Sequence, residues 1–204
     1  MRINKHLTMT AMNSQTAQRD GKAMLDRKAG SKTALQEGLG WPSESKRPLL
    51  CLPAGLSKAT GGELFEHVLP GLLTLPIEML VVGKGSSDYG TMVTKLAKEH
   101  GHRIAIMQND EAHLDAMYQA SDMALFLAPP SSKDLTACLH AGVVPIAPSM
   151  DELDNYNPVQ ESGNAFLYDK IDPWHCFAAV VRALETHIFP FDWRTIQKHC
   201  IGVM

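Results

Sequence analysis

The sequence has no hydrophobic run of the roughly 18 to 20 residues that are needed to cross a membrane. Its first residues, Met1 to His6, do not form the apolar core of a signal peptide. It also lacks an excess of positive charge, because the 204 residues carry a net charge of −3 and the isoelectric point is near 6.3. These absences predict a cytoplasmic protein with neither a membrane nor a nucleic acid as partner.

Residues that build metal sites, disulfides and thiol nucleophiles are scarce or badly spaced. The four cysteines, Cys51, Cys138, Cys176 and Cys200, form no C-x-x-C pair, so we expect buried free thiols rather than a zinc ribbon or a disulfide scaffold. The nine histidines include no H-E-x-x-H sequence, and His100 and His102 lie at the expected end of a helix. Cys138 and His140 are two residues apart on a short helix and point in different directions. We predict no metal and no catalytic residue.

The chain has the composition of a globular domain, with 45% hydrophobic and 20% charged residues. Short apolar runs alternate with helical patterns from residue 49 onward. The runs that are typical of buried strands span residues 49–52, 77–82, 103–107, 122–128, 143–147 and 165–168. This alternation predicts an α/β fold, a Rossmann-like doubly wound parallel sheet. We expect Pro70 to kink or divide its helix, and Pro145 to mark an edge strand or a bulge.

The N-terminal part follows a different pattern. Its first 34 residues are polar, so we expect them to pack loosely, and Lys32 to Glu37 should form a short helix. We therefore divide the chain into a lead-in or hinge segment, 1–46, and an α/β domain, 47–204.

Ligands of doubly wound sheets bind at the carboxyl ends of the strands, which here are followed by loops at 53–62, 83–88, 107–111, 129–136 and 148–155. In the second loop, Gly83, Lys84 and Gly85 offer free amides and a cation to a phosphate or ribose, although two glycines can also serve only the turn. Asp110 could contact a ligand or simply cap the next helix. Neither a Walker A sequence nor G-x-G-x-x-G occurs.

Several segments follow one another in an order that is typical of a known family. They are Gly21-Lys22-Ala23 with Lys32 to Gln36 (KTALQ), Leu80 to Gly85 (LVVGKG), Asn109 to Ala112 (NDEA) with Ala120 to Pro129 (ASDMALFLAP), Gly142 to Ile146 (GVVPI) and Trp193 to Gln197 (WRTIQ). Together they resemble motifs in the C-terminal half of the bacterial glycogen and starch synthases, GT-B glycosyltransferases that use ADP-glucose. The resemblance covers nearly the whole chain and implies a GT-B C-terminal domain.

The residues that hold the donor in that family are replaced. Its "SRLTxQKG" loop binds the donor diphosphate through an arginine and a lysine, and the resemblance places Gly55 and Thr60 at those positions. The glutamate of its "EPCGLTQLY" loop contacts the donor sugar, but residues 129–137 contain no glutamate. Its "RTGGL" loop is replaced by residues 148–153, whose carboxylates should repel a diphosphate.

The resemblance thus implies a degenerate ADP-glucose α-glucan glucosyltransferase domain that is inactive alone, a pseudoenzyme. Two alternatives stay open: the C-terminal half of a split or truncated active synthase, with an N-terminal synthase domain as partner, or a non-catalytic module that binds another enzyme of carbohydrate metabolism. The expected ligands are ADP, ADP-glucose or an α-glucan, and no cofactor is expected. The residues expected to form a remaining nucleotide-sugar site are Gly83, Lys84, Gly85, Asp110, Leu135, Thr136 and Lys58.

Overall fold

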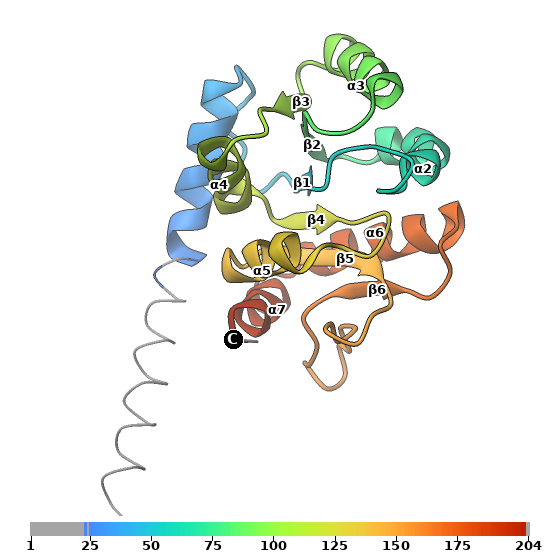
Figure 1. Cartoon of the computed structure of the whole chain (residues 1–204). Helices are drawn as coiled ribbons and strands as arrows, with labels where there is room; N and C mark the ends of the chain where they lie inside the picture. Colours follow the sequence, from blue (N-terminus) through green and yellow to red (C-terminus); the bar gives the residue numbers. More distant parts are fainter. Residues whose placement is uncertain (1–22, 24, 203–204) are drawn as a thin grey trace, which may run out of the picture.

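The computed structural model describes residue 23 and residues 25–202 (Figure 1). Predictions that concern residues 1–22 lie outside this part, including those for Gly21 and Lys22 of the first matching segment. Within the described part, no helix is both long and apolar enough to span a bilayer.

The core is a sheet of six parallel strands in the order β3-β2-β1-β4-β5-β6. The strands are β1 (Leu49–Leu52), β2 (Glu78–Val82), β3 (Ile104–Met107), β4 (Met123–Leu125), β5 (Val144–Pro148) and β6 (Phe166–Tyr168). The predicted Rossmann-like sheet is therefore confirmed. β4 is shorter than the expected run 122–128.

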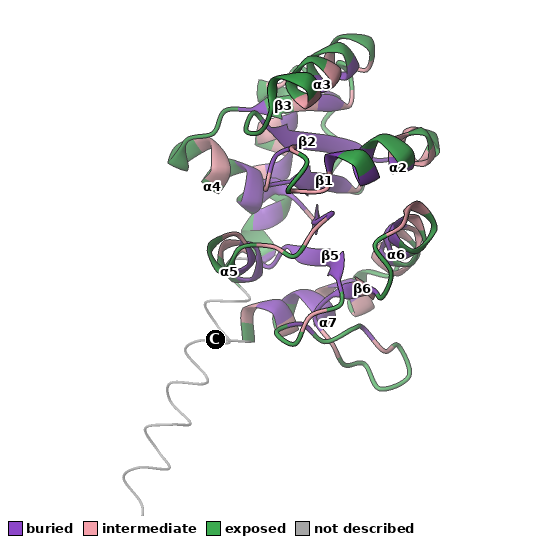
Figure 2. Cartoon of the chain, turned by 45° about the vertical axis from the view of Figure 1, so that its right-hand side comes forward, coloured by how far each residue is buried: buried purple, intermediate pink, exposed green. Residues whose placement is uncertain are grey.

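Helices cover both faces of the sheet. They are a helix at residues 25–38, called the N-terminal helix below, α2 (Gly62–Thr74), α3 (Ser87–Glu99), α4 (Glu111–Ala120), α5 (Ser132–His140), α6 (Pro173–His187) and α7 (Pro190–Gly202). α2 and α6 pack together on one face, and α4 and α5 lie on the other. Figure 2 shows the buried layer following the strands between them. Every residue of β1, β2 and β5 is buried, as expected for strands covered on both faces.

Pro70 does not divide its helix, which corrects one expectation. α2 runs as one element from Gly62 to Thr74 with Pro70 inside it. Pro70 and Glu66, whose carbonyl loses a donor, are both exposed, so water can satisfy that carbonyl. Buried Val68 and Leu72 hold the helix against the sheet on either side of the proline.

Pro145 does not mark an edge strand, because β5 lies between β4 and β6. The amide of Val144 donates to the Asp122 carbonyl, and the carbonyl of Ile146 accepts from Phe126, so these neighbours make the ladder toward β4. Pairing with β6 begins only at Ile146, opposite Phe166. The missing N–H of Pro145 therefore removes no ladder bond.

The four cysteines are buried and free, as predicted. Burial raises the pKa of the thiols of Cys51, Cys176 and Cys200 to about 12, and raises that of Cys138 as well. These thiols stay protonated near neutral pH and serve as small core residues.

The N-terminal helix packs closely on the domain, whereas the sequence suggested loose packing. Leu25, Lys28, Lys32 and Gln36, spaced by three or four residues, form its buried face. This face covers the amino ends of the central strands, which we call the amino edge of the sheet. The helix is also longer than the predicted 32–37.

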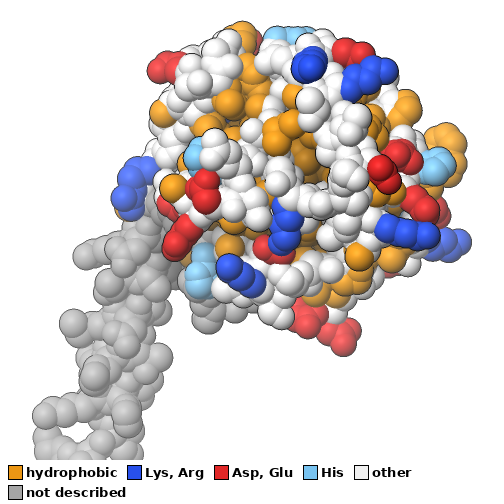
Figure 3. All heavy atoms as spheres, turned by 45° about the horizontal axis from the view of Figure 1, so that its top comes forward, with side chains coloured by type: hydrophobic (Ala, Val, Ile, Leu, Met, Phe, Trp, Pro, Cys, Tyr) orange, Lys and Arg blue, Asp and Glu red, His pale blue; other side chains and the backbone are white. Residues whose placement is uncertain are grey.

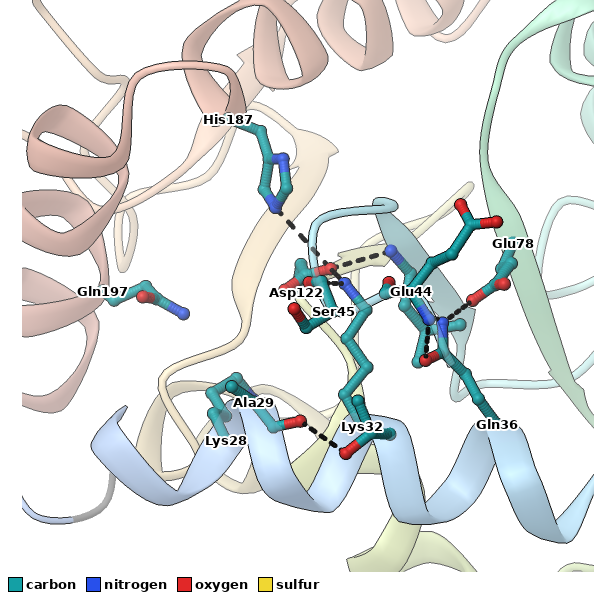
Figure 4. A network of polar contacts seen from close by, with 12 residues as sticks. Lys28, Ala29, Lys32, Gln36, Glu44, Ser45, Glu78, Asp122, His187 and Gln197 are labelled. Atoms are coloured by element: carbon teal, nitrogen blue, oxygen red, sulfur yellow. Dashed lines mark hydrogen bonds and ion pairs between the residues drawn. The ribbon is translucent and has the colours of Figure 1, made fainter. Parts of the chain in front are cut away.

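Lys32 is held at the amino edge by an ion pair. Its ammonium lies 2.6 Å from the carboxylate of Asp122, which directly precedes β4, and it also donates to the carbonyl of Ser45 (Figure 4). Asp122 further accepts the amide of Leu49 and lies 3.6 Å from His187. Burial pushes the pKa of the Asp122 carboxyl up, but the contacts with His187 and Lys32 outweigh it and hold that pKa below its usual value.

Two further contacts tie the N-terminal helix to the sheet and to α4. Gln36 donates to the buried carboxylate of Glu78 at the start of β2, and burial raises the pKa of Glu78. Lys28 donates to the carbonyls of Tyr118 and Gln119 at the end of α4, and burial lowers its pKa to about 8. The matching segment KTALQ therefore has a structural role here.

The segment WRTIQ is structural too. Trp193 is buried and stacks on Phe166, with His187 edge-on to its ring. Gln197 donates to the carbonyl of Gly142, which lies between α5 and β5. This segment thus fixes α7 to the α5–β5 connection.

Candidate functional site

The carboxyl ends of the six strands form the opposite rim of the sheet, which we call the carboxyl edge. The strand order reverses between β1 and β4, which is the point where doubly wound sheets commonly bind ligands. The loops after β1, β2, β3 and β4 lie around this point of the edge. They contain all the residues that the sequence analysis selected, apart from those on α5.

The loops after β1 and β2 pair with each other. The amide of Leu56 donates to the carbonyl of Lys84 at 3.0 Å, and the amide of Ser86 donates to the carbonyl of Leu56 at 3.1 Å. Leu56 and Gly85 thus form a parallel bridge that prolongs the β1–β2 pair. Both loops are held by backbone bonds before any ligand binds.

Glycine is required on both sides of this bridge. Gly55 has a φ of 65°, and a Cβ atom there would lie 2.1 Å from the carbonyl oxygen of Lys84. Gly85 has a φ of 135°, and a Cβ atom there would lie 1.8 Å from the carbonyl oxygen of Leu56. This loop conformation excludes a side chain at position 55.

The rest of the first loop is closed by its own polar groups. The hydroxyl of Thr60 accepts the amide of Ser57 at 2.8 Å and donates to the carbonyl of Gly55 at 3.1 Å. Lys58 is exposed and lines neither of the two cavities that Lys84 lines. The structure therefore does not bring Lys58 together with the other candidate residues.

Lys84 lies where two cavities meet. The first cavity is bounded by the end of β2, by Gly83 to Ser87 and by the first turns of α3. The second is a groove between the N-terminal helix, α4 and α5, and Lys84 shares its wall with Asn109, Asp110 and Lys133. Gly83, Lys84 and Gly85 thus line the first cavity, Asp110 lines the second, and Lys84 is common to both.

Asp110 caps α4. Its carboxylate accepts the amide of His113 at 3.0 Å and lies 2.7 Å from the imidazole Nδ1 of His113. The amide and imidazole of His113 hold the pKa of the Asp110 carboxyl below its usual value. The capping interpretation is thus confirmed, while the carboxylate still lines the groove.

The start of α5 offers different amides from those expected. The amide of Leu135 donates to the carbonyl of Ser131, and Thr136 lies one residue further into the helix, so neither amide is free for a ligand. Ser131 caps the helix by accepting the amide of Asp134 at 3.1 Å. The amides left for a ligand are those of Ser132 and Lys133.

Asn109 and Lys133 line the groove but were not selected from the sequence. Both lie within loops that the strand pattern marked as ligand-facing, so a search of those loops for every polar side chain would have found them. The groove is mixed in charge, because Asp110, Glu111, Asp115 and Asp134 accompany its lysines. Figure 3 shows the same mixture over one face of the molecule, where basic and acidic side chains are interspersed.

The loop after β5 keeps its carboxylates in solvent. Asp151 and Glu152 are exposed, and Ser149 donates to Asp169 in the loop after β6 at 2.6 Å. Among residue 23 and residues 25–202, no group of three or more His, Cys, Asp and Glu side chains is arranged to hold a metal ion.

Comparisons with known proteins find relatives that are similar in sequence to most of this chain. No family model matches. Glycogen synthase 1 of Synechocystis sp. is 25% identical over 187 residues, which cover 87% of this chain and 39% of the relative. The glycogen synthase of Gloeobacter violaceus is 28% identical over 204 residues, covering 95% of this chain and 42% of the relative. The chain thus spans about two fifths of the length of these curated relatives and matches their C-terminal part.

Solved structures show the same fold. The catalytic domain of starch synthase IV from Arabidopsis thaliana, bound to ADP and acarbose, superposes with a TM-score of 0.69 at 20% identity over 86% of this chain and 38% of that chain. Anabaena Alr3699/HepE in complex with UDP and glucose gives a TM-score of 0.63 at 15% identity, covering 85% of this chain and 47% of that chain. A C-terminal domain of a group 1 glycosyl transferase from Francisella tularensis gives a TM-score of 0.61 at 12% identity. The superposition covers 84% of this chain and 90% of that chain. The chain therefore has the fold of a GT-B C-terminal domain and is similar in sequence to the C-terminal part of the glycogen synthases.

Proposed function

We propose that this domain is a degenerate glycogen or starch synthase-type domain that keeps a weak nucleotide site and does not transfer glucose by itself. The observation that carries the proposal is the Leu56–Gly85 bridge, which excludes a side chain at position 55. In the resembling family this position holds an arginine that binds the donor diphosphate.

The other donor-binding features point the same way. Thr60 stands at the family's lysine position, and its hydroxyl is hydrogen-bonded to the backbone of its own loop. The loop after β5 adds Asp151 and Glu152, which oppose a negatively charged ligand. Each charge-assisted hydrogen bond to a charged group contributes about 1.5–3 kcal/mol, so losing two cations weakens donor binding by several powers of ten.

A weak nucleotide site can remain at the junction of the two cavities. Lys84 supplies a cation beside the backbone of Gly83 and Gly85, and Lys133 supplies a second one in the wall of the groove. Asn109 and Asp110 offer side-chain oxygens that can accept hydrogen bonds from a ribose. Structures of the same fold were solved with ADP or UDP, so both nucleotides are candidates.

Calorimetric titration with ADP, UDP and ADP-glucose at low salt tests the site. We expect a dissociation constant in the micromolar to millimolar range and at least about tenfold weaker binding in Lys84→Ala, because the charge-assisted contact is lost. Lys198→Ala, which removes an exposed lysine of α7, is the matched control and should bind like the wild type. No heat at millimolar nucleotide would contradict the residual site.

Incorporation of labelled glucose from ADP-glucose into glycogen tests the absence of transfer. We expect no incorporation by this chain alone, and transfer at the rate of an ordinary glycogen synthase would refute the proposal. Adding the separately purified N-terminal domain of a glycogen synthase examines the split-enzyme alternative, which the collinear match to the C-terminal part of the relatives favours. Transfer that appears only in the mixture would establish that alternative.

A further inference from the structure

The start of α6 combines an exposed tryptophan with an excess of negative charge. Trp174 is 81% exposed, whereas Trp41 and Trp193 are each 5% exposed. It lies in the first turn of α6, which follows β6, and therefore at the carboxyl edge. Ile171, three residues earlier, is 59% exposed. Tryptophan is among the side chains that contribute most to binding at protein–protein interfaces, so this exposed position indicates a contact with another molecule.

The loops after β5 and β6 are bonded to each other beside Trp174. The hydroxyl of Ser149, after β5, donates to Asp169, after β6, at 2.6 Å, and the amide of Ser149 donates to the last carbonyl of β6 at 3.0 Å. Asp172 accepts the amide of His175 at 2.9 Å, which fixes the turn that carries Trp174. These bonds hold one surface, called the acidic surface below, which consists of residues 149–152 and 169–175.

The acidic surface concentrates the negative charge of the chain. Its four carboxylates, which face one lysine, are those of Asp151, Glu152, Asp169 and Asp172. With His175 neutral, its net charge equals the −3 of the whole chain, so the other residues balance one another. Three of the carboxylates belong to exposed residues, and the side chain of Asp172 is 38% exposed. This charge attracts a cationic partner and repels nucleic acids and anionic lipids.

The exposure of Trp174 favours a segment of a protein over a small ligand. Small molecules bind in concave pockets that bury most of their surface, whereas the ring of Trp174 is largely open to solvent. In the described part of the chain, no three His, Cys, Asp or Glu side chains are placed to hold a metal ion. Among cationic side chains, arginine both stacks on an indole and pairs with carboxylates through two parallel hydrogen bonds. A segment with several arginines can make both contacts at once.

We propose that the acidic surface binds an arginine-rich segment of another protein. One guanidinium stacks on the indole of Trp174, and others pair with Asp151, Glu152 and Asp169. Ile171 packs against the aliphatic part of an arginine side chain. The surface is separate from the proposed nucleotide site, because β5 lies three strand spacings, about 14 Å, from β2.

Titration with an octa-arginine peptide, which contains no tryptophan, tests the acidic surface. We expect saturable binding at low salt that weakens as salt is added, because exposed charges are screened. In ¹⁵N-labelled protein, the indole N–H signal of Trp174 should shift, and those of the buried Trp41 and Trp193 should not. Trp174→Ala should bind at least about fivefold more weakly, and Trp174→Phe should recover part of the affinity.

A pair of double variants separates this surface from general charge attraction. Asp151→Asn with Glu152→Gln removes two exposed carboxylates and leaves the cap of α6 intact, and it should weaken octa-arginine binding about tenfold. Glu37→Gln with Glu185→Gln removes the same charge from exposed positions outside the surface, and its affinity should stay within about twofold of the wild type. Octalysine should bind more weakly than octa-arginine, because an ammonium group does not stack in the same way.

Four results would overturn the proposal. The first is no binding of octa-arginine at millimolar concentration and low salt. The second is equal weakening in the two double variants, which would indicate attraction to the whole chain. The third is unchanged affinity in Trp174→Ala. The fourth is a shift of the Trp174 signal by spermine at lower concentrations than by octa-arginine, which would assign the surface to a small polyamine.

Discussion

The two edges of the sheet use their charged side chains in different ways. At the amino edge, Lys28, Lys32 and Gln36 enter the interior and bind carbonyls or carboxylates of α4, Asp122 and Glu78. At the carboxyl edge, backbone bonds between loops hold the structure together, and Lys58 and Lys84 remain exposed. The same residue type therefore stabilises the fold at one edge and is free to meet a ligand at the other.

The segments that match the synthases and the segments that depart from them lie in different parts of the molecule. The matching segments KTALQ and WRTIQ hold the N-terminal helix and α7 in place, so what they preserve is the scaffold. The departures gather in the loops of the carboxyl edge. A chain can keep the first set of residues and its fold while it loses the second set and its chemistry.

The largest effect is expected from removing the buried cation of the amino edge. Lys32→Met keeps the aliphatic stem but leaves Asp122 partly buried without its ion-pair partner, which should lower the free energy of unfolding by about 3 kcal/mol. Urea denaturation measures this. Lys95→Met, whose ammonium is exposed and 3.9 Å from Glu99, should change it by less than about 0.5 kcal/mol. Equal losses in the two variants would remove the contrast between buried and exposed lysines.

A smaller loss is expected at the bridge of the carboxyl edge. Gly85→Ala forces a side chain into a positive φ and against the carbonyl of Leu56, which should cost about 2 kcal/mol and weaken ADP binding as well. Gly90→Ala, in α3 with open space around the added methyl group, should instead stabilise by about 0.5–1 kcal/mol. A neutral Gly85→Ala would mean that the bridge is not held rigidly.

The next effect concerns α5, which lines the groove beside α4. Ser131→Ala removes the side-chain oxygen that accepts the amide of Asp134, and should destabilise by about 1 kcal/mol in thermal or urea unfolding. Ser132→Ala changes the neighbouring exposed residue and should stay within about 0.5 kcal/mol. If the two serines behave alike, α5 does not depend on its cap.

The smallest effect is expected from the exposed cap of α6 and should depend on pH. The amide and imidazole of His175 lower the pKa of Asp172, so its stabilising contribution is present above the unfolded pKa and is lost as the pH falls through the lower folded value. Asp172→Asn can still cap but cannot ionise. Its melting temperature should fall below that of the wild type near neutral pH and converge with it in acid, once the pH has fallen through the lowered pKa of Asp172. A constant offset at every pH would contradict this assignment.

Periodicity predicted the sheet because its strands are short apolar runs between helical patterns, and local sequence decides such runs. The sequence wrongly placed Pro145 on an edge strand. The free-energy cost of a proline in a strand depends on whether a neighbouring strand needs its missing N–H, and here none does. Pairing with β6 begins one residue later, and the sequence of β5 alone does not contain that information.

The candidate site was predicted in part. Lys84 and Asp110 line one groove because they follow the neighbouring parallel strands β2 and β3. The amides of Leu135 and Thr136 were misplaced because the exact start of α5 depends on the Ser131 cap. The ion pair of Lys32 was missed because its partner, Asp122, lies 90 residues away in the sequence.

The position of Gly55 also bears on the proposed loss of donor binding, because it decides whether a cation can stand there. Replacing Gly55 by arginine would return the family's residue type, but its Cβ atom would collide with the carbonyl oxygen of Lys84. The cation could return only after the loop after β2 had moved, and that loop is itself fixed by Gly85. A cation at position 55 therefore requires at least two coordinated changes, one at Gly55 and one in the loop after β2.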